Sequence, residues 1–146
     1  MIRMSHEDCI FCKIIDGEIP SAKVYEDEDV YAFLDISQVA KGHTLVIPKT
    51  HVKNIYKTPA EVASKLFERV PKIANAIKDT YKPIGMNLLN NNEKAADQSV
   101  FHLHIHILPR YVENDGFSSN WTVHTDDYTS NDLQQIASEI NSAIKL

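Results

Sequence analysis

Three histidines occupy every second position of the stretch Phe-His-Leu-His-Ile-His-Ile-Leu-Pro, residues 101–109. Neighbouring imidazoles repel one another when both are protonated, so a row of them is unfavourable unless an anion or a metal lies against it. Ligands two residues apart on one strand stand about 6.6 Å apart, at ~3.3 Å per residue, which disfavours one ion shared by all three. The alternative is an anion site with a neutral imidazole as nucleophile and protonated neighbours that stabilise charge. Such a site suits two-step phosphoryl or nucleotidyl transfer.

The two cysteines, Cys9 and Cys12, form the second chemical pattern. A gap of two residues suits a metal or redox pair better than a structural disulfide. The pair alone leaves open a metal site or two buried free thiols. No apolar run reaches the ~20 residues of a membrane span, and the N-terminus lacks the pattern of a signal peptide, so we expect a cytoplasmic protein with reduced thiols.

The histidines need a strand to hold them. Strict alternation predicts a strand from Phe101 to Pro109, with the histidines on one face and Phe101, Leu103, Ile105 and Ile107 on the other. An acidic turn between two apolar runs predicts a hairpin. The remaining strands are expected at 24–26, 30–34, 43–47 and 86–89.

Two helices are expected. The first begins at Thr58-Pro59-Ala60-Glu61, with Thr58 as cap, and its apolar face includes Phe67. Pro71 should kink this helix or divide it. The second runs from about Asn131 to Ile144, capped by Ser130 or Asn131. These elements indicate an α+β fold, an antiparallel sheet of about five strands with helices against one face.

Composition limits the function classes. The 146 residues are 43% hydrophobic, which fits one globular domain. The formal net charge of −5 argues against a general nucleic-acid binder, which would present a basic face. A small anionic ligand stays compatible with this charge, and we expect no membrane or nucleic-acid partner.

The histidine stretch resembles the histidine-triad motif of the HIT family. Further similar blocks follow in family order: Ile10-Phe11-Cys12-Lys13-Ile14-Ile15, Phe33-Leu34-Asp35-Ile36-Ser37, His43-Thr44-Leu45-Val46-Ile47-Pro48-Lys49 and Gln98-Ser99-Val100. The resemblance, to the bacterial Hit/Hint-like branch, implies one HIT domain over residues 1–146. Its core would span 9–111, and 112–146 would form a C-terminal extension. It also implies a homodimer whose sheet continues across both copies.

The activity implied by the resemblance is release of a nucleoside monophosphate, of AMP type, from phosphoramidates or dinucleoside polyphosphates. Leu108-Pro109-Arg110 is similar to relatives that hydrolyse diadenosine polyphosphates, whereas the opening block is similar to nucleoside phosphoramidases. The choice between these purine-nucleotide substrates therefore stays open. The alternatives from other classes are a nucleotide-binding regulatory or scaffold protein with little turnover, and a zinc hydrolase that uses the triad as ligands.

The resemblance also assigns residues. His104 would be the covalent nucleophile, supported by His106 and His43, and His102 would complete the triad. Asp35 would bind the ribose hydroxyls. Phosphate contacts would come from Asn91, Gln98 and Ser99, and the base would lie among Phe11, Ile14, Phe33 and Ile36.

Some bacterial members of the family hold a structural zinc ion at four positions that correspond here to Cys9, Cys12, His51 and His102. Two thiolates and two imidazoles make a closed tetrahedral site without a position for water, which is structural rather than catalytic chemistry. Such an ion would tie the N-terminal segment to the histidine stretch.

Overall fold

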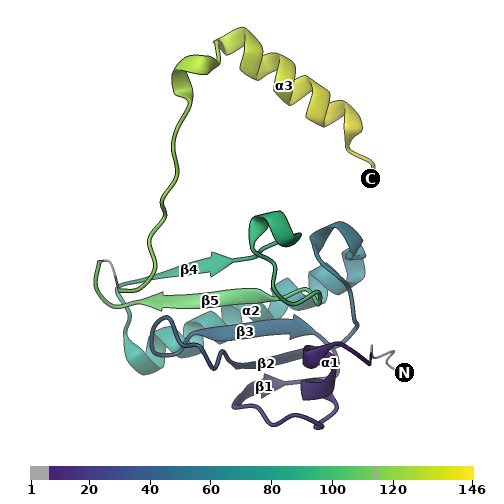
Figure 1. Cartoon of the computed structure of the whole chain (residues 1–146), viewed down its shortest axis with the longest axis vertical. Helices are drawn as coiled ribbons and strands as arrows, with labels where there is room; N and C mark the ends of the chain where they lie inside the picture. The colour runs from purple at the N-terminus through teal and green to yellow at the C-terminus, as the bar shows by residue number, and fades with distance from the viewer. Residues whose placement is uncertain (1–6, 114) are drawn as a thin grey trace.

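The computed structural model describes residues 7–113 and 115–146. Within them, five strands form one antiparallel sheet in the order β1-β2-β3-β5-β4 (Figure 1). The strands are β1 (Lys23–Glu26), β2 (Val30–Leu34), β3 (Thr44–Pro48), β4 (Gly85–Leu89) and β5 (Ile105–Arg110). The predicted hairpin and the antiparallel sheet are confirmed.

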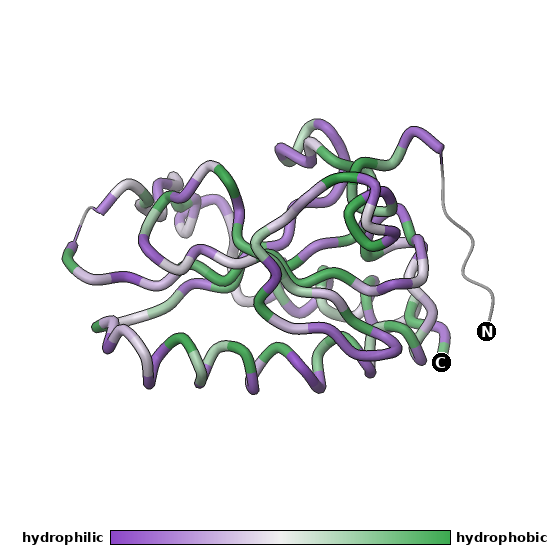
Figure 2. The backbone as a smooth tube through the Cα atoms, turned by 90° about the horizontal axis from the view of Figure 1, so that it is seen from below, coloured by the Kyte–Doolittle hydropathy of each residue, from purple (hydrophilic) through white to green (hydrophobic). Residues whose placement is uncertain are grey.

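The long helix α2 (Ala60–Tyr81) covers one face of the sheet. Its buried residues repeat at helical spacing, and hydrophobic and hydrophilic positions alternate along it (Figure 2). The buried residues are Leu66, Val70, Ile73 and Ile77. Together with Val30, Ala32, Val46, Ile105 and Ile107 of the strands they form the main core.

Of the two outcomes expected at Pro71, a kink or a division, division does not occur, because the helix continues through Pro71 as one element. Two other expectations about α2 need correction. Phe67 is 44% exposed and does not face the sheet. Thr58 is not the cap: Pro59 is the N-cap residue, and the hydroxyl of Thr58 donates to the carbonyl of Asn54, 2.7 Å away.

A short helix that the sequence did not predict, α1 (Ile10–Ile15), covers the opposite face. Four successive residues of β2, Val30–Phe33, are buried, because alternate side chains pack towards α2 and towards α1. The α1 side contains Phe11, Cys12, Ile14, Tyr31, Phe33, Leu45 and Ile47. The expectation of helices against one face is therefore wrong, since the sheet is covered on both faces.

The histidine stretch is only partly a strand. β5 begins at Ile105, so His102 and His104 precede the ladder and the three histidines do not share one strand face. The segment before β5 is tied instead by the amide of Leu103, which donates to the carbonyl of Val52 at 2.8 Å. Phe101, expected in the core, is 42% exposed.

The C-terminal helix α3 (Ser130–Ala143) exists as expected, but its cap is Thr129, which forms a capping box with Asp132. Figure 1 shows α3 lying apart from the body at the end of an extended segment. It contains no buried residue, so it does not pack on its own sheet. Among the helices of residues 7–113 and 115–146, none has the length and apolarity that crossing a membrane requires.

Candidate functional site

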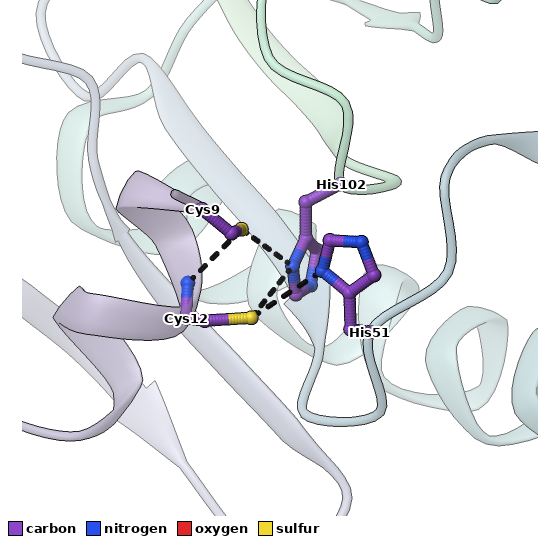
Figure 3. Close-up of side chains that lie close together, drawn as sticks. All are labelled: Cys9, Cys12, His51 and His102. Carbon is purple, nitrogen blue, oxygen red and sulfur yellow. Dashed lines mark hydrogen bonds between the residues drawn. The ribbon is translucent and has the colours of Figure 1, made fainter. Parts of the chain in front are cut away.

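Cys9, Cys12, His51 and His102 converge at the N-terminal end of α1 (Figure 3). Cys9 caps the helix, and its Sγ accepts the amide proton of Cys12 at 3.3 Å. Nδ1 of His102 lies 3.3 Å from Sγ of Cys9 and 3.6 Å from Sγ of Cys12. Nδ1 of His51 lies 3.3 Å from Sγ of Cys12. One potential ligand atom from each residue lies within 4.8 Å of all the others.

These side chains fit a tetrahedral zinc ion. Zn–S bonds of about 2.3 Å and Zn–N bonds of about 2.0–2.1 Å place sulfur and nitrogen ligands about 3.6 Å apart, close to the observed spacing. Nε2–H of His102 donates to the carbonyl of Pro48 at 2.8 Å, so the lone pair of neutral His102 is on Nδ1 and faces the sulfurs. Burial raises the pKa of the Cys9 thiol to about 11, so a bound cation is needed to hold it as a thiolate at neutral pH.

His102 therefore belongs to the cysteine cluster. Both of its ring nitrogens are engaged there, and its ring is not among the side chains that line the pocket around His104. The geometry gives His102 the position of a metal ligand, and its backbone carbonyl accepts a hydrogen bond from His104. His102 and His106 fall in two separate groups of potential ligands among the described residues, so the histidines of the motif do not surround one ion.

The carbonyl of His102 fixes the tautomer of His104. Nδ1–H of His104 donates to this oxygen at 2.8 Å, which leaves the lone pair on Nε2. The His104 side chain is 4% exposed, and burial lowers its pKa. At neutral pH His104 is thus an uncharged imidazole with a free lone pair at Nε2, the state that nucleophilic attack needs.

His43 and His106 form a hydrogen-bonded pair. The amide of Val39 donates to Nδ1 of His43 at 3.3 Å, so neutral His43 carries its proton on Nε2 and donates to Nδ1 of His106 at 2.9 Å. The remaining proton of His106 is then on Nε2. Burial, with smaller contributions from the neighbouring His104 and His43, lowers the pKa of His106 to about 4. The expectation of protonated neighbours is therefore corrected: desolvation keeps them neutral at pH 7.

A pocket of about 260 Å³ opens beside these histidines, between α1 and the end of β2. Six of the residues expected to bind a nucleotide line it together with His104 and His106: Phe11, Ile14, Phe33, Asp35, Ile36 and Ser99. Ile36 is fully exposed at the rim. The sequence did not assign the other lining residues, which are Ile10, Ile19, Pro20, Ser21, Leu34, Leu45 and Val100. The turn signal at residues 16–20 was the available sign that this segment bends back towards the site.

The carboxylate of Asp35 lies at the polar end of this pocket. One oxygen, Oδ2, is 3.6 Å from Nε2 of His43, and the other accepts the amide proton of Ser37 at 2.8 Å. The side chain keeps 20% exposure, so it is open to a ligand from the pocket side. Burial lowers the pKa of His43, although the charge of Asp35 opposes this effect.

Gln98 is engaged within the protein rather than presented to the pocket. It is 4% exposed, and its Nε2 donates to the carbonyls of Lys53 and Val100 at 2.8 and 3.0 Å. Its Oε1 accepts from the amide of Glu93 and from the side chain of Asn54. A phosphate contact by Gln98 would require it to change partners.

Asn91 likewise does not line the pocket, since its side chain donates to the carbonyl of Asp97 at 3.4 Å. Its neighbour Asn90 is closer to the chemistry and donates to the carbonyl of His104 at 3.0 Å. Three consecutive asparagines carry no sequence signal that could separate these roles.

Phe11 connects the two groups of side chains. Its ring meets those of His104 and His102 edge-on, with centroids 5.1 and 5.9 Å apart, and that of Phe33 at 5.4 Å. The cysteine cluster and the wall of the pocket are therefore in direct contact.

Comparison with known proteins decides the family. Residues 16–113 match the HIT domain. The chain belongs to the HIT family. It is 64% identical to Protein hit of Bacillus subtilis over 92% of each chain. The crystal structure of a HIT family protein from Bacillus anthracis superposes with a TM-score of 0.93 at 59% identity, over 97% of this chain and 100% of that one. A HIT family member from Bacillus subtilis gives a TM-score of 0.93 at 61% identity, over 96% and 99% of the two chains.

Two less similar relatives of this HIT protein have informative names. It is 39% identical to adenosine 5′-monophosphoramidase HNT1 of Candida albicans, over 85% of this chain and 84% of that protein. A Zn-bound histidine triad family protein from Mycobacterium smegmatis superposes with a TM-score of 0.71 at 33% identity, over 94% and 98% of the chains. The family inferred from the motif and the fold inferred for its core are confirmed.

Proposed function

We propose that this HIT protein is a nucleotide hydrolase that releases a nucleoside monophosphate of AMP type through a covalent intermediate on His104. The observation that carries the proposal is the hydrogen bond from Nδ1 of His104 to the carbonyl of His102, which leaves Nε2 of a neutral, buried imidazole free beside the pocket. The similarity to an adenosine 5′-monophosphoramidase supports the substrate class. Phosphoramidates and dinucleoside polyphosphates both supply such a monophosphate.

In the first step Nε2 of His104 attacks the α-phosphorus. The N–P bond forms, the bond from phosphorus to the leaving group breaks, and its electron pair leaves with that group. The leaving atom takes a proton from the solvent, and Nε2–H of His106 would donate a hydrogen bond to it as negative charge develops there. The hydrogen bond of 2.9 Å from His43 to Nδ1 of His106 holds this ring with its Nε2 proton towards the substrate.

In the second step a water molecule attacks phosphorus, the N–P bond breaks, and its electron pair returns to Nε2 of His104. The water gives its proton to the solvent. The neutral pair of His43 and His106 keeps its two protons in both steps and acts by hydrogen bonding, with no change in its charge.

The pocket residues would hold the nucleotide in place. Phe11, Ile14, Phe33 and Ile36 offer an apolar surface for the base, and the carboxylate of Asp35 accepts hydrogen bonds from the ribose hydroxyls. Of the three residues expected to contact the phosphate, Ser99 lines the pocket, and its exposed hydroxyl would donate a hydrogen bond to a phosphate oxygen. Asn91 and Gln98 would contribute by shaping the loop between β4 and His104.

Zinc at Cys9, Cys12, His51 and His102 would supply a structural crosslink, because four protein ligands leave no position for water. The Zn-bound relative from Mycobacterium smegmatis supports this cofactor. We also propose, from the resemblance, that the protein is a single-domain homodimer whose sheet continues across both copies, and that it acts in the cytoplasm, where its thiols stay reduced.

The direct test is intact-protein mass spectrometry after brief mixing with adenosine phosphoramidate or a diadenosine polyphosphate, quenched above neutral pH because phosphohistidine bonds are labile in acid. Wild type should show an adenylyl adduct and release AMP. His104→Ala should form no adduct and lose at least about a thousandfold in kcat/KM. Calorimetric titration with AMP should show that the variant still binds the product, which verifies that its pocket is intact.

Absence of both adduct and AMP release in wild type, with AMP binding retained, would favour a nucleotide-binding protein without turnover. An equal rate for His104→Ala would remove the nucleophile from the proposal. The ratio of the two kcat/KM values of wild type would identify the preferred substrate.

A further inference from the structure

The loop of residues 35–43 joins β2 to β3 and carries two of the groups that the proposed chemistry uses. Asp35 stands at its start and His43 at its end, and Oδ2 of Asp35 lies 3.6 Å from Nε2 of His43. The residues between them form bends and a turn. The relative position of these two side chains therefore depends on what holds the loop closed.

The side chain of Gln38 closes this loop. Its Nε2 donates one proton to the carbonyl of Asp35 at 2.6 Å and the other to the carbonyl of His43 at 2.7 Å. Its Oε1 accepts the amide proton of Gly42 at 3.0 Å. These three hydrogen bonds form a clamp, the Gln38 clamp. Gln38 is an exposed residue, and ordering a long exposed side chain costs conformational entropy that the three bonds must offset.

The Gln38 clamp also acts on the imidazole of His43. Val39 follows Gln38 directly, and its amide donates to Nδ1 of His43 at 3.3 Å. This hydrogen bond places the proton of neutral His43 on Nε2, from which it is donated to Nδ1 of His106. A shift of residues 38 and 39 would therefore change both the place and the tautomer of His43.

The loop is also attached to β5. The hydroxyl of Tyr111, the residue directly after this strand, donates to the carbonyl of Lys41 at 2.6 Å. Because β5 carries His106, this bond ties the loop to the strand that holds the partner of His43. The Gln38 clamp thus shapes a loop whose position against His106 is already fixed.

We propose that Gln38 is a positioning residue of the active site, which holds Asp35 in place for the ribose hydroxyls and His43 in place for His106. Gln38 does not line the pocket itself, so it acts through these two residues. This role rests on the proposed function of the site. It predicts two separate effects, one on nucleotide affinity through Asp35 and one on the chemical step through His43.

The first measurement is a double-mutant cycle on the affinity for AMP, determined by calorimetric titration. Gln38→Met keeps the length of the side chain but removes its amide donors. It should raise the Kd for AMP about tenfold, because the carboxylate of Asp35 then meets the ribose hydroxyls in poorer geometry. In an Asp35→Asn background the same change should have almost no effect. Ser37→Ala, which alters an exposed side chain of the same loop, is the matched control and should leave the Kd unchanged.

A nucleotide without ribose hydroxyls separates positioning from general damage to the pocket. The Kd for 2′,3′-dideoxyadenosine monophosphate should be nearly the same in wild type and Gln38→Met. An equal rise in Kd for this nucleotide and for AMP would overturn the role towards Asp35. The same conclusion would follow if Gln38→Met had equal effects with Asp35 and with asparagine at that position.

The second measurement examines His43 directly. Long-range ¹H–¹⁵N NMR spectra distinguish the two tautomers of a histidine. Wild type should show His43 with its proton on Nε2, and Gln38→Met should show a mixture of both tautomers. The variant should still form the adenylyl adduct on His104, about tenfold more slowly than wild type.

A His43 spectrum in Gln38→Met equal to that of wild type would overturn the role towards His43. The spectra and the AMP affinities do not depend on turnover. They therefore decide the role of Gln38 even if wild type binds nucleotides without forming an adduct, a result that would contradict the proposed hydrolase and not the positioning role.

Discussion

The low pKa of His106 predicts a specific loss of stability in acid. Its pKa falls from 6.5 to about 4 on folding because burial disfavours the charged ring. A histidine whose pKa is lowered contributes stability that is fully present above pH 6.5 and is lost as the pH falls towards 4, because the unfolded chain binds the proton first. At pH 4.5 the linkage relation gives ~2.6 kcal/mol, and partial exposure of the ring reduces this to about 2 kcal/mol.

The perturbation is His106→Asn, which removes the titrating group. Urea unfolding of wild type and variant should be compared at pH 7.5 and pH 4.5 with the same zinc content. The variant lacks the hydrogen bond to His43 at both pH values, so the energy of this bond cancels when the two changes in unfolding free energy are compared. Acid protonation of the metal ligands cancels as well, because both proteins have the same ligands. Wild type should lose about 2 kcal/mol more than the variant between the two pH values, equivalent to about 6 °C in Tm. Parallel pH dependences would refute the assignment of His106 as a buried neutral group.

Three further changes test the site. Cys12→Ser should lower the Tm, and the Tm of this variant should not change when a chelator is added, whereas chelation should lower the Tm of wild type. Wild type loaded with cobalt should also show a sulfur-to-metal absorption band that the variant lacks. Asn54→Ala should lower the free energy of unfolding by about 1–2 kcal/mol, because it removes the buried amide that donates to Gln98 and Glu93, and Asn75→Ala on the exposed side of α2 should cost little. Asp35→Asn should raise KM for adenosine substrates but leave it nearly unchanged for 2′,3′-dideoxyadenosine substrates, and an equal rise for both would remove the ribose contact.

Local patterns were sufficient to predict the hairpin, the other strands and α2, because each rests on a period of about two or 3.6 residues. They failed where tertiary contacts decide the conformation. The alternation of the histidine stretch suggested one continuous strand, yet His102 is drawn into the cysteine cluster, so the ladder starts at Ile105. α1 has six residues, too few for a helical period, and it owes its place to Cys9 and to packing on β2 and β3.

The four residues of the cysteine cluster illustrate a second limit. His51 and His102 lie 39 and 90 residues after Cys12, and no local pattern links them to it. Only the resemblance to a family suggested the set that the fold then brings together. For Gln98 the resemblance suggested a contact that the fold does not present. We expected this residue to bind phosphate, but both protons of its side-chain amide are donated to backbone carbonyls.

The arrangement around Phe11 explains how a structural ion would influence nucleotide binding. Phe11 sits between the two cysteines in sequence and is 6% exposed, with its ring against both His102 and His104. A crosslink through Cys9 and Cys12 fixes α1, and α1 in turn fixes this wall of the pocket. The tautomer of His104 depends instead on the backbone carbonyl of His102, which does not require the His102 side chain. Loss of the ion should therefore weaken nucleotide binding and stability more than it changes the chemistry of the nucleophile.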